Sequence, residues 1–385
     1  MNWKIPLFKT YSDQEDVEAV TRIIKRGTYW AVGPEIEEFE RKIADFVGVK
    51  YTLSFNSGTS ALHTLLLAHD IKNKEVIVPS FTFIATPNAV LLAGGIPVFA
   101  ESESETFGLC AEDVKKRINE KTKAIILIHY GGLPGKDTEK LKKIADENNI
   151  LLIEDAAESL GSIINNKKVG SLGHSAIFSF CQNKILATGE GGLITTDSEE
   201  IYKKAKLIRS HGRVENNGDY FSSVEDNDYV QIGYNFRMPT MIAALGLSQF
   251  NKINKVIELR RNHTFYLNKE LSKILGIRIP SEIKGHFRVY QMYTIQLDNE
   301  KIRNNLQEHL TNKGIMTKVY FNPIHLKTLY KERYNYNKGE LPLTEELSKR
   351  VLTLPLYPDL NKEQLDYIIE SINEFFGDKK NGRNI

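Results

Sequence analysis

The sequence predicts an α/β fold, with a mostly parallel central sheet in a large domain and a smaller α+β domain after it. Through most of the chain, short apolar runs alternate with longer amphipathic runs, as strands and helices do around such a sheet. From about Leu247 this alternation is lost and a long charged run begins. The 385 residues also exceed the roughly 250–300 that one core supports. We therefore expect a large domain over residues 1–248 and a small domain over 249–376.

Five apolar runs are expected to form buried strands of the sheet: EVIVPSF (75–81), IPVFAE (96–101), AIILIHY (124–130), NILLIED (149–155) and SAIFSF (175–180). A further strand is expected at GLITTD (192–197), after a glycine-rich turn. A helix is expected over residues 137–149, where Leu141, Ile144 and Ala145 share one face. Strand, helix and strand at this spacing indicate parallel pairing.

The small domain is expected to be built from fewer and less regular elements: a charged helix (250–274), YQMYTIQL (290–297), a polar helix, IMTKVYF (315–321) and a closing helix through Phe376. Residues 1–25 are expected to pack with this domain. Residues 377–385 are polar and charged, so a disordered tail is expected there.

Composition and charge exclude several classes of function. The formal net charge is only +2, so no overall field attracts nucleic acid or a membrane surface. The first residues contain no apolar stretch of signal-peptide length, and the least polar stretch, residues 89–100, is broken by Gly-Gly and Pro. The two cysteines, Cys110 and Cys181, provide no disulfide framework. We expect a soluble cytoplasmic protein without nucleic-acid or membrane partners.

Polar residues at the ends of the predicted strands are the first candidates for a site, because ligands gather there in open α/β sheets. Ser57, Gly58 and Thr59 precede a helical run, so their N–H groups could hold a phosphate; a plain helix cap is the commoner explanation. Asp155 ends a buried strand and needs a partner. It could cap a helix, or it could pair with a cationic ring nitrogen.

Two cofactor classes are disfavoured by the same region. Glu158, His129 and His174 could suggest a metal site, but no HExxH or similarly tight ligand spacing occurs, and we predict none. The segment Gly189–Gly192 resembles a dinucleotide fingerprint only in part, since Ile194 stands where the last glycine is needed. A strand rather than a helix follows it, which contradicts a nicotinamide site.

Lys184, in the segment FSFCQNKILATGEGGLITTD, is either a solvated loop lysine or a covalent cofactor anchor. Pyridoxal 5'-phosphate would account for all the candidates together, because it needs a lysine, a carboxylate for its ring nitrogen, an anion site and an aromatic face. Phe81 is the expected aromatic, and Ser179 is a further expected phosphate donor. Each feature is weak alone, and their combination favours this cofactor.

Seven motifs together resemble the DegT/DnrJ/EryC1/StrS sugar aminotransferases, which have the fold-type I architecture of pyridoxal phosphate-dependent transferases. The motifs are GPEIEEFE (33–40), NSGTSAL (56–62), VPSFTFIATPNAV (78–90), EDAAESLGS (154–162), the segment around Lys184, GYNFRM (233–238) and LPLYP (354–358). The resemblance covers nearly the whole chain, from Ile5 to Phe376.

The resemblance implies a role for each matching residue. Lys184 falls on the catalytic lysine that binds the cofactor covalently, and Asp155 falls on the carboxylate that pairs with the pyridine nitrogen. The other expected cofactor contacts are Phe81 for stacking, Glu158 in the same pocket, and Gly58, Thr59 and Ser179 at the phosphate. Asn235 falls on an asparagine that reaches the phosphate of the neighbouring subunit, which implies a homodimer with shared active sites.

Departures from the family pattern indicate the substrate. Glu158 stands where many members have Gln, which resembles the perosamine-synthase branch, whereas Gln182 replaces a frequent Gly. Lys184 excludes the dehydratases, which have His there. The resemblance implies transfer of an amino group from L-glutamate to C4 of a 4-keto-6-deoxy sugar linked to GDP, dTDP or UDP. A 3-keto sugar and a non-catalytic regulator on the same fold are the alternatives. Substrate contacts are expected from Trp30, Asn183, Tyr320 and His325.

Overall fold

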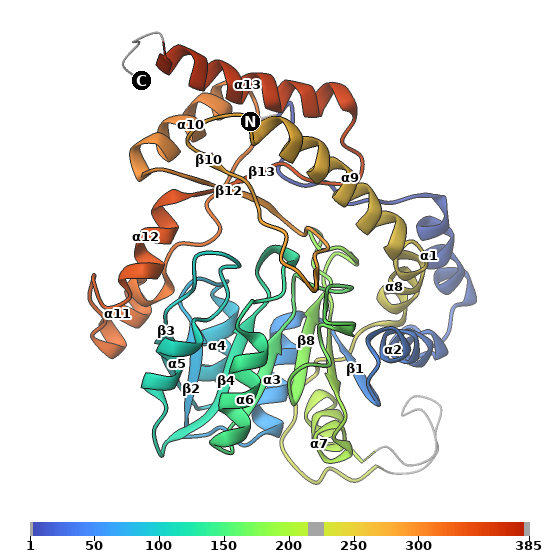
Figure 1. The fold of residues 1–385 in the computed structure, drawn as a ribbon. Coiled ribbons are helices and arrows are strands. Elements are labelled where there is room, and N and C mark those ends of the chain that lie inside the picture. Colours follow the sequence, from blue (N-terminus) through green and yellow to red (C-terminus); the bar gives the residue numbers. More distant parts are fainter. Residues whose placement is uncertain (1–2, 215–226, 381–385) are drawn as a thin grey trace.

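A seven-stranded sheet forms the centre of the computed structural model, which describes residues 3–214 and 227–380 (Figure 1). Its strand order is β1-β9-β8-β5-β4-β2-β3. The strands are β1 (Tyr51–Phe55), β2 (Glu75–Pro79), β3 (Ile96–Ala100), β4 (Thr122–Ile128), β5 (Leu151–Asp155), β8 (Ser175–Ser179) and β9 (Gly192–Thr196). All neighbours pair in parallel except β9, which runs antiparallel to β1 and β8. The predicted mostly parallel sheet is confirmed.

Helices bury both faces of this sheet, which is why its strands are almost continuously apolar. On one face, Val76 and Val78 pack in the core that includes Leu62 and Leu65 of α3; on the other, Ile77 packs with Leu141 of α6. The connecting helices are α2 (Pro34–Val47), α3 (Gly58–Ala68), α4 (Ala85–Leu92), α5 (Ala111–Arg117), α6 (Thr138–Glu147) and α7 (Glu199–Arg209), with a 3₁₀ turn, η1 (Tyr130–Gly132).

A second core surrounds a three-stranded antiparallel sheet of β10 (Ile277–Arg278), β12 (Tyr293–Leu297) and β13 (Val351–Leu354). Three helices contribute to this core: α9 (Ile253–Leu271), α10 (Glu300–Asn312) and α13 (Lys362–Lys380). A small third sheet, β11 (His286–Phe287), β6 (Ile163–Ile164) and β7 (Lys167–Lys168), joins the two parts of the chain. The start of the N-terminal segment reaches the second core, where Ile5 is buried and Leu7 O accepts a hydrogen bond from Leu356 N.

The C-terminal half differs from the prediction in four places. The expected helix over 250–274 begins at Ile253, after a break at Lys252 that separates it from α8 (Thr240–Asn251), which packs against α1 (Gln14–Arg26). The run IMTKVYF, expected as an element of the small domain, makes only single bridges at Ile315 and Lys318. Helix α13 continues to Lys380, into the segment expected to be disordered. The remaining tail, residues 381–385, lies outside the described residues.

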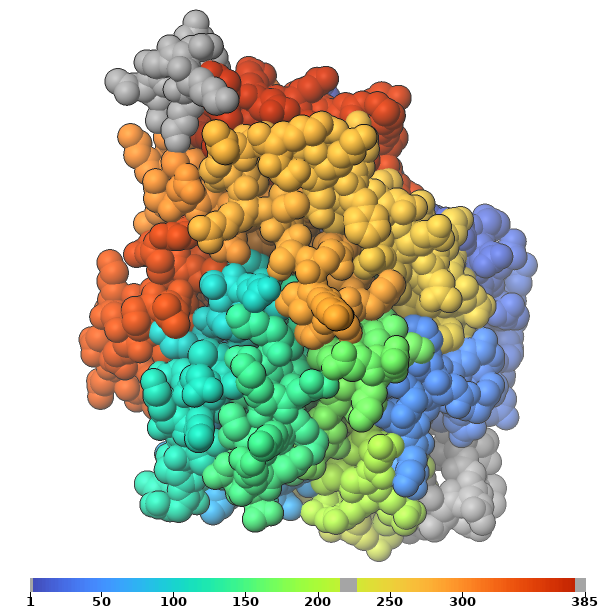
Figure 2. All heavy atoms as spheres, in the orientation of Figure 1, coloured from blue at the N-terminus to red at the C-terminus, as the bar shows by residue number. Residues whose placement is uncertain are grey.

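The fourth difference concerns residues 324–345, which were expected in the small domain but pack on the large sheet. They contain η2 (Ile324–Leu326), α11 (Thr328–Tyr334) and the start of α12 (Pro342–Arg350). Ile324, Tyr330 and Leu341 are buried in the core of α3 and α4. Figure 2 shows this segment seated against the region of β3. The expected boundary at residue 248 therefore does not separate the two hydrophobic cores, because a later segment packs in the core of the large sheet.

None of the helices in the described ranges is long and apolar enough to cross a membrane.

Candidate active site

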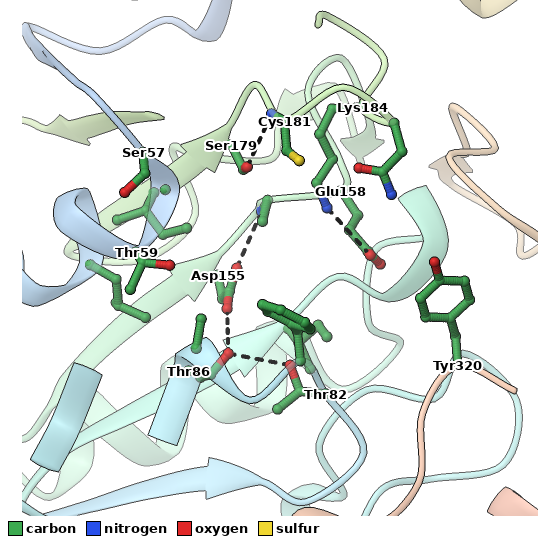
Figure 3. Close-up of a pocket in the computed structure, with 18 of the residues that line it drawn as sticks. Ser57, Thr59, Thr82, Thr86, Asp155, Glu158, Ser179, Cys181, Lys184 and Tyr320 are labelled. Carbon is green, nitrogen blue, oxygen red and sulfur yellow. Dashed lines mark hydrogen bonds and ion pairs between the residues drawn. The ribbon is translucent and has the colours of Figure 1, made fainter. Parts of the chain in front are cut away.

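A cavity of about 370 Å³ opens at the carboxyl ends of β4, β5 and β8, where the topology of an α/β sheet places ligands. Its lining includes the last residues of these strands, Ile128, Asp155 and Ser179. The start of α3 and the loop around Lys184 complete one side. Figure 3 shows these side chains converging on the same space.

Asp155 is held at the end of β5 with its carboxylate in this cavity. It is 8% exposed, and its Oδ2 accepts a hydrogen bond of 2.7 Å from Thr86 Oγ1 while Oδ1 accepts one of 3.3 Å from Ala157 N. Burial raises the pKa of Asp155, and these hydrogen bonds offset only part of the rise. Residues 156–162 form turns, so Asp155 caps no helix. A cationic ligand nitrogen would stabilise its charged form.

Lys184 lies in a turn beside the carboxylate of Glu158, so it is not a solvated loop lysine. Its Nζ is 3.5 Å from Glu158 Oε1, and the two side chains are 13% and 10% exposed. The other Glu158 oxygen accepts a hydrogen bond of 2.8 Å from Gly131 N, which fixes the carboxylate's orientation. The amine of Lys184 is therefore aimed into the cavity by an acid that is itself held (Figure 3).

The start of α3 provides an anion site in the same cavity. Ser57 is the N-cap and accepts a hydrogen bond from Ser60 N, so the capping explanation is correct for that residue. Gly58 and Thr59 line the cavity at the first turn, whose N–H groups have no partner within the helix. A Cβ atom on Gly58 would stand 2.9 Å from the Cβ of Ser179, so only glycine allows this close approach.

The placement of Phe81 corrects the prediction that it offers its ring to the cofactor. Phe81 is 0% exposed, packs with Phe107 and Tyr130, and does not line the cavity. Phe83, two residues later, is 59% exposed and does line it. Strand β2 ends at Pro79 and the chain then bends, so strand alternation could not identify the aromatic that faces the cavity.

The expected substrate residues separate into two pairs. Asn183 and Tyr320 line the cavity. His325 does not: it is fully buried, with Nδ1 2.7 Å from Ser80 Oγ and Nε2 3.3 Å from Glu345 Oε1, so its role in this chain is structural. Trp30 also lies outside the cavity, where its indole N–H donates to Ile23 O at 3.1 Å.

Asn235 is exposed and lies outside the cavity of its own chain. Its backbone forms a bridge with Ser210, which holds the segment against the end of α7. Its expected action in a neighbouring subunit stays a prediction.

Several lining residues were missed by the sequence analysis, among them Phe8, Glu190 and Lys318. Phe8 comes from the N-terminal segment, Glu190 from the glycine-rich turn, and Lys318 from the run IMTKVYF of the small domain. No local pattern marks Phe8 or Lys318, because only the tertiary fold brings these segments to the cavity. Glu190 lies beside Gly191 and Gly192, and that turn was the one available signal.

The histidines considered for a metal site are engaged elsewhere. His129 Nε2 lies 3.0 Å from Glu154 Oε2, and His174 Nδ1 accepts a hydrogen bond of 2.9 Å from Leu152 N. Within residues 3–214 and 227–380, no group of three or more His, Cys, Asp or Glu side chains could hold a metal ion.

This sheet topology, with a lysine and a buried aspartate meeting at its strand ends, defines the class as the fold-type I pyridoxal phosphate-dependent transferases. Within that class, the chain belongs to the DegT/DnrJ/EryC1/StrS aminotransferase family, whose model matches residues 10–373. The family is pyridoxal phosphate-dependent, and its named members include sugar aminotransferases.

Known relatives cover nearly the whole chain. A GDP-perosamine synthase from Escherichia coli O157:H7 is 35% identical over 376 residues, which are 97% of this chain and 99% of the relative. A pleiotropic regulatory protein from Geobacillus stearothermophilus is 34% identical over 359 residues, 92% of each chain. The solved structure of Helicobacter pylori PseC, an aminotransferase involved in the biosynthesis of pseudoaminic acid, superposes with a TM-score of 0.91 at 29% identity and covers 97% of this chain and 99% of its own.

Proposed function

We propose that this chain uses pyridoxal 5'-phosphate to transfer an amino group from L-glutamate to C4 of a nucleotide-linked 4-keto-6-deoxy sugar. The reaction would take place in the cytoplasm and supply a precursor of a cell-surface polysaccharide or glycan. The observation that carries the proposal is the meeting of Lys184, Glu158 and Asp155 in one cavity. The 35% identity to a GDP-perosamine synthase supports C4 of a 6-deoxy sugar as the site of amination.

The residues of the cavity fit the cofactor. Lys184 would bind it covalently, Asp155 would pair with its pyridine nitrogen, and Gly58, Thr59 and Ser179 would hold its phosphate. Phe83, rather than Phe81, would cover a face of the ring. When bound, the cofactor supplies an electron sink for cleavage of a bond at the carbon that carries the amino group.

Each side chain then has a physical task. Asp155, whose pKa is raised by burial, would gain a cationic partner in the ring nitrogen and would favour its protonated form. Glu158, fixed by Gly131 N–H, orients Lys184 Nζ. With the cofactor present, Lys184 Nζ would be placed to remove a proton from the amine-bearing carbon and to return one. The walls around it bury the reacting groups and limit access of water.

The proposal is tested by product analysis. The protein is loaded with pyridoxal phosphate and incubated with L-glutamate and, separately, with 4-keto and 3-keto sugar nucleotides carrying GDP, dTDP or UDP. We expect 2-oxoglutarate and a new amine at C4, located by NMR. Amination only at C3 would establish the 3-keto alternative. A protein that binds the cofactor but turns over none of these compounds would instead fit the regulatory alternative, which one relative's name brings to attention.

We also propose a homodimer in which Asn235 of one chain completes the phosphate site of the other. Its exposure and its position outside the cavity of its own chain support this arrangement. Lys184→Ala and Asn235→Ala chains should each be impaired, and mixing them should restore activity, because one site of each hybrid dimer has both residues intact. A mixture of Lys184→Ala with Lys184→Arg chains is the matched control and should stay inactive. Verified hybrids without rescue would contradict a shared site.

A further inference from the structure

Lys318 places a positive charge at the entrance of the cavity. Its backbone is fixed by two hydrogen bonds to Thr353 beside β13, with Lys318 N donating to Thr353 O at 3.2 Å and Thr353 N donating to Lys318 O at 2.8 Å. Its side chain is exposed and lines the cavity. An exposed ammonium on a backbone fixed in this way can contact a ligand that enters from solvent.

The other charged groups of the lining are already engaged. Glu158 pairs with Lys184, Asp155 accepts a hydrogen bond from Thr86, and Glu190 accepts one of 3.6 Å from Cys181 Sγ. Over the parts of the chain that the structure describes, no carboxylate lies within ion-pair distance of Lys318. Because Lys184 is committed to the cofactor in the proposed enzyme, Lys318 is the lining ammonium that stays available to a substrate.

Tyr320 lies beside this ammonium and lines the same cavity as Lys184. Lys318 Nζ lies 4.7 Å from the centroid of the Tyr320 ring. Burial raises the pKa of Tyr320, and the negative charge of Glu158 raises it further. Figure 3 shows Tyr320 beside the pair of Glu158 and Lys184. Lys318 and Tyr320 line the same cavity as Glu158 and Lys184.

We propose that Lys318 binds an oxyanion of the substrate and so helps to select anionic substrates. This inference rests on the proposed function, in which the donor and the acceptor occupy the same cavity in turn. L-Glutamate carries a second carboxylate, and a sugar nucleotide carries a diphosphate. Both place a negative group a few bonds from the reacting carbon, where an ammonium at the entrance can contact it.

The test separates the two sources of the oxyanion. Wild type, Lys318→Met and Lys318→Arg are compared in two half-reactions, followed by the visible absorbance of the loaded protein on addition of L-glutamate, and then of the sugar nucleotide. We expect Lys318→Met to raise KM about tenfold in at least one half-reaction with little change in kcat, and Lys318→Arg to restore it. An effect on the half-reaction with L-glutamate would identify the carboxylate as the group that Lys318 binds, and an effect on the half-reaction with the sugar nucleotide would identify the diphosphate. Calorimetric titration with glutarate and with nucleoside diphosphates should show the same loss without turnover.

Lys301→Met, which removes an exposed lysine of α10 away from the cavity, is the matched control. If Lys318→Met matches wild type in both half-reactions, or is no worse than Lys301→Met, the inference is wrong. A fall in kcat with unchanged KM would also contradict it, because that result indicates a structural role. A wild-type protein without either half-reaction would contradict the proposed function, which is a different failure.

Discussion

The floor and the entrance of the cavity are built in different ways. The floor consists of Asp155, Ser179 and Gly58, which come from strand ends and a helix start and are held by hydrogen bonds or close packing. The entrance includes Phe8 and Lys318, which come from two segments far from these strand ends in the sequence. In the proposed enzyme the floor would hold the cofactor, whose chemistry is constant, whereas the entrance would contact the substrate. The residues expected to bind the cofactor thus lie on the strands and helices of the sheet, and those expected to select the substrate lie on the segments that cover it.

The largest effect is expected at Lys184, the residue on which the chemistry of the floor depends. Lys184→Ala should abolish turnover and the visible absorbance of the loaded protein, because no amine is left to bind the cofactor. Lys184→Arg is the control, since it keeps a positive charge near Glu158 but stays protonated and cannot act as the nucleophile. Multiple turnovers by either variant would remove Lys184 from the proposed role. Cofactor that stays bound through its phosphate alone would not contradict that role.

A second large effect is expected at Asp155. Asp155→Asn keeps the shape of the side chain but removes the charge that favours a protonated ring nitrogen, so kcat should fall about 10²–10³-fold. The free energy of unfolding should change much less, because burial without a cation already raises the pKa of this carboxylate. Steady-state kinetics and denaturant unfolding of the same preparation measure both. Wild-type kcat in the variant would leave Asp155 as a purely structural residue.

The floor was predictable from the sequence because its residues follow directly from local patterns. All five strands taken as buried lie in the sheet, and the residues that end them determine where the polar groups gather. Strand β1 was not predicted: it is a short run whose place in the sheet depends on pairing with the distant β9. The break between α8 and α9 was also missed, since Lys252 is held there by Asp13 and Asp16 of the N-terminal segment.

The entrance was predicted poorly, because it depends on contacts between remote segments. Tyr320 and Asn183 were identified, but His325 lies only a few residues from Tyr320 and is buried against Ser80 and Glu345. Composition cannot separate two polar residues of one segment when long-range packing decides which of them faces the cavity. Composition likewise could not show which of the two phenylalanines of the motif VPSFTF, Phe81 or Phe83, faces the cavity.

The smallest and sharpest test uses these two phenylalanines, which lie on different sides of the boundary between core and cavity. Phe81→Ala removes a fully buried ring from the cluster with Phe107 and Tyr130 and should lower the free energy of unfolding by about 3–5 kcal/mol. Phe83→Ala removes an exposed ring that lines the cavity, so stability should change little. Loss of one stacking face, worth about 0.5–1.5 kcal/mol, should weaken cofactor binding by up to roughly tenfold.

Each variant is measured twice, by unfolding of the cofactor-free protein in urea and by titration with pyridoxal phosphate followed in the visible range. The two variants control for each other, because the same side chain is removed two residues apart. If Phe81→Ala weakened the cofactor without lowering stability while Phe83→Ala did neither, the stacking ring would be Phe81. The aromatic wall of the site would then have to rearrange on loading, since Phe81 is 0% exposed in the present structure.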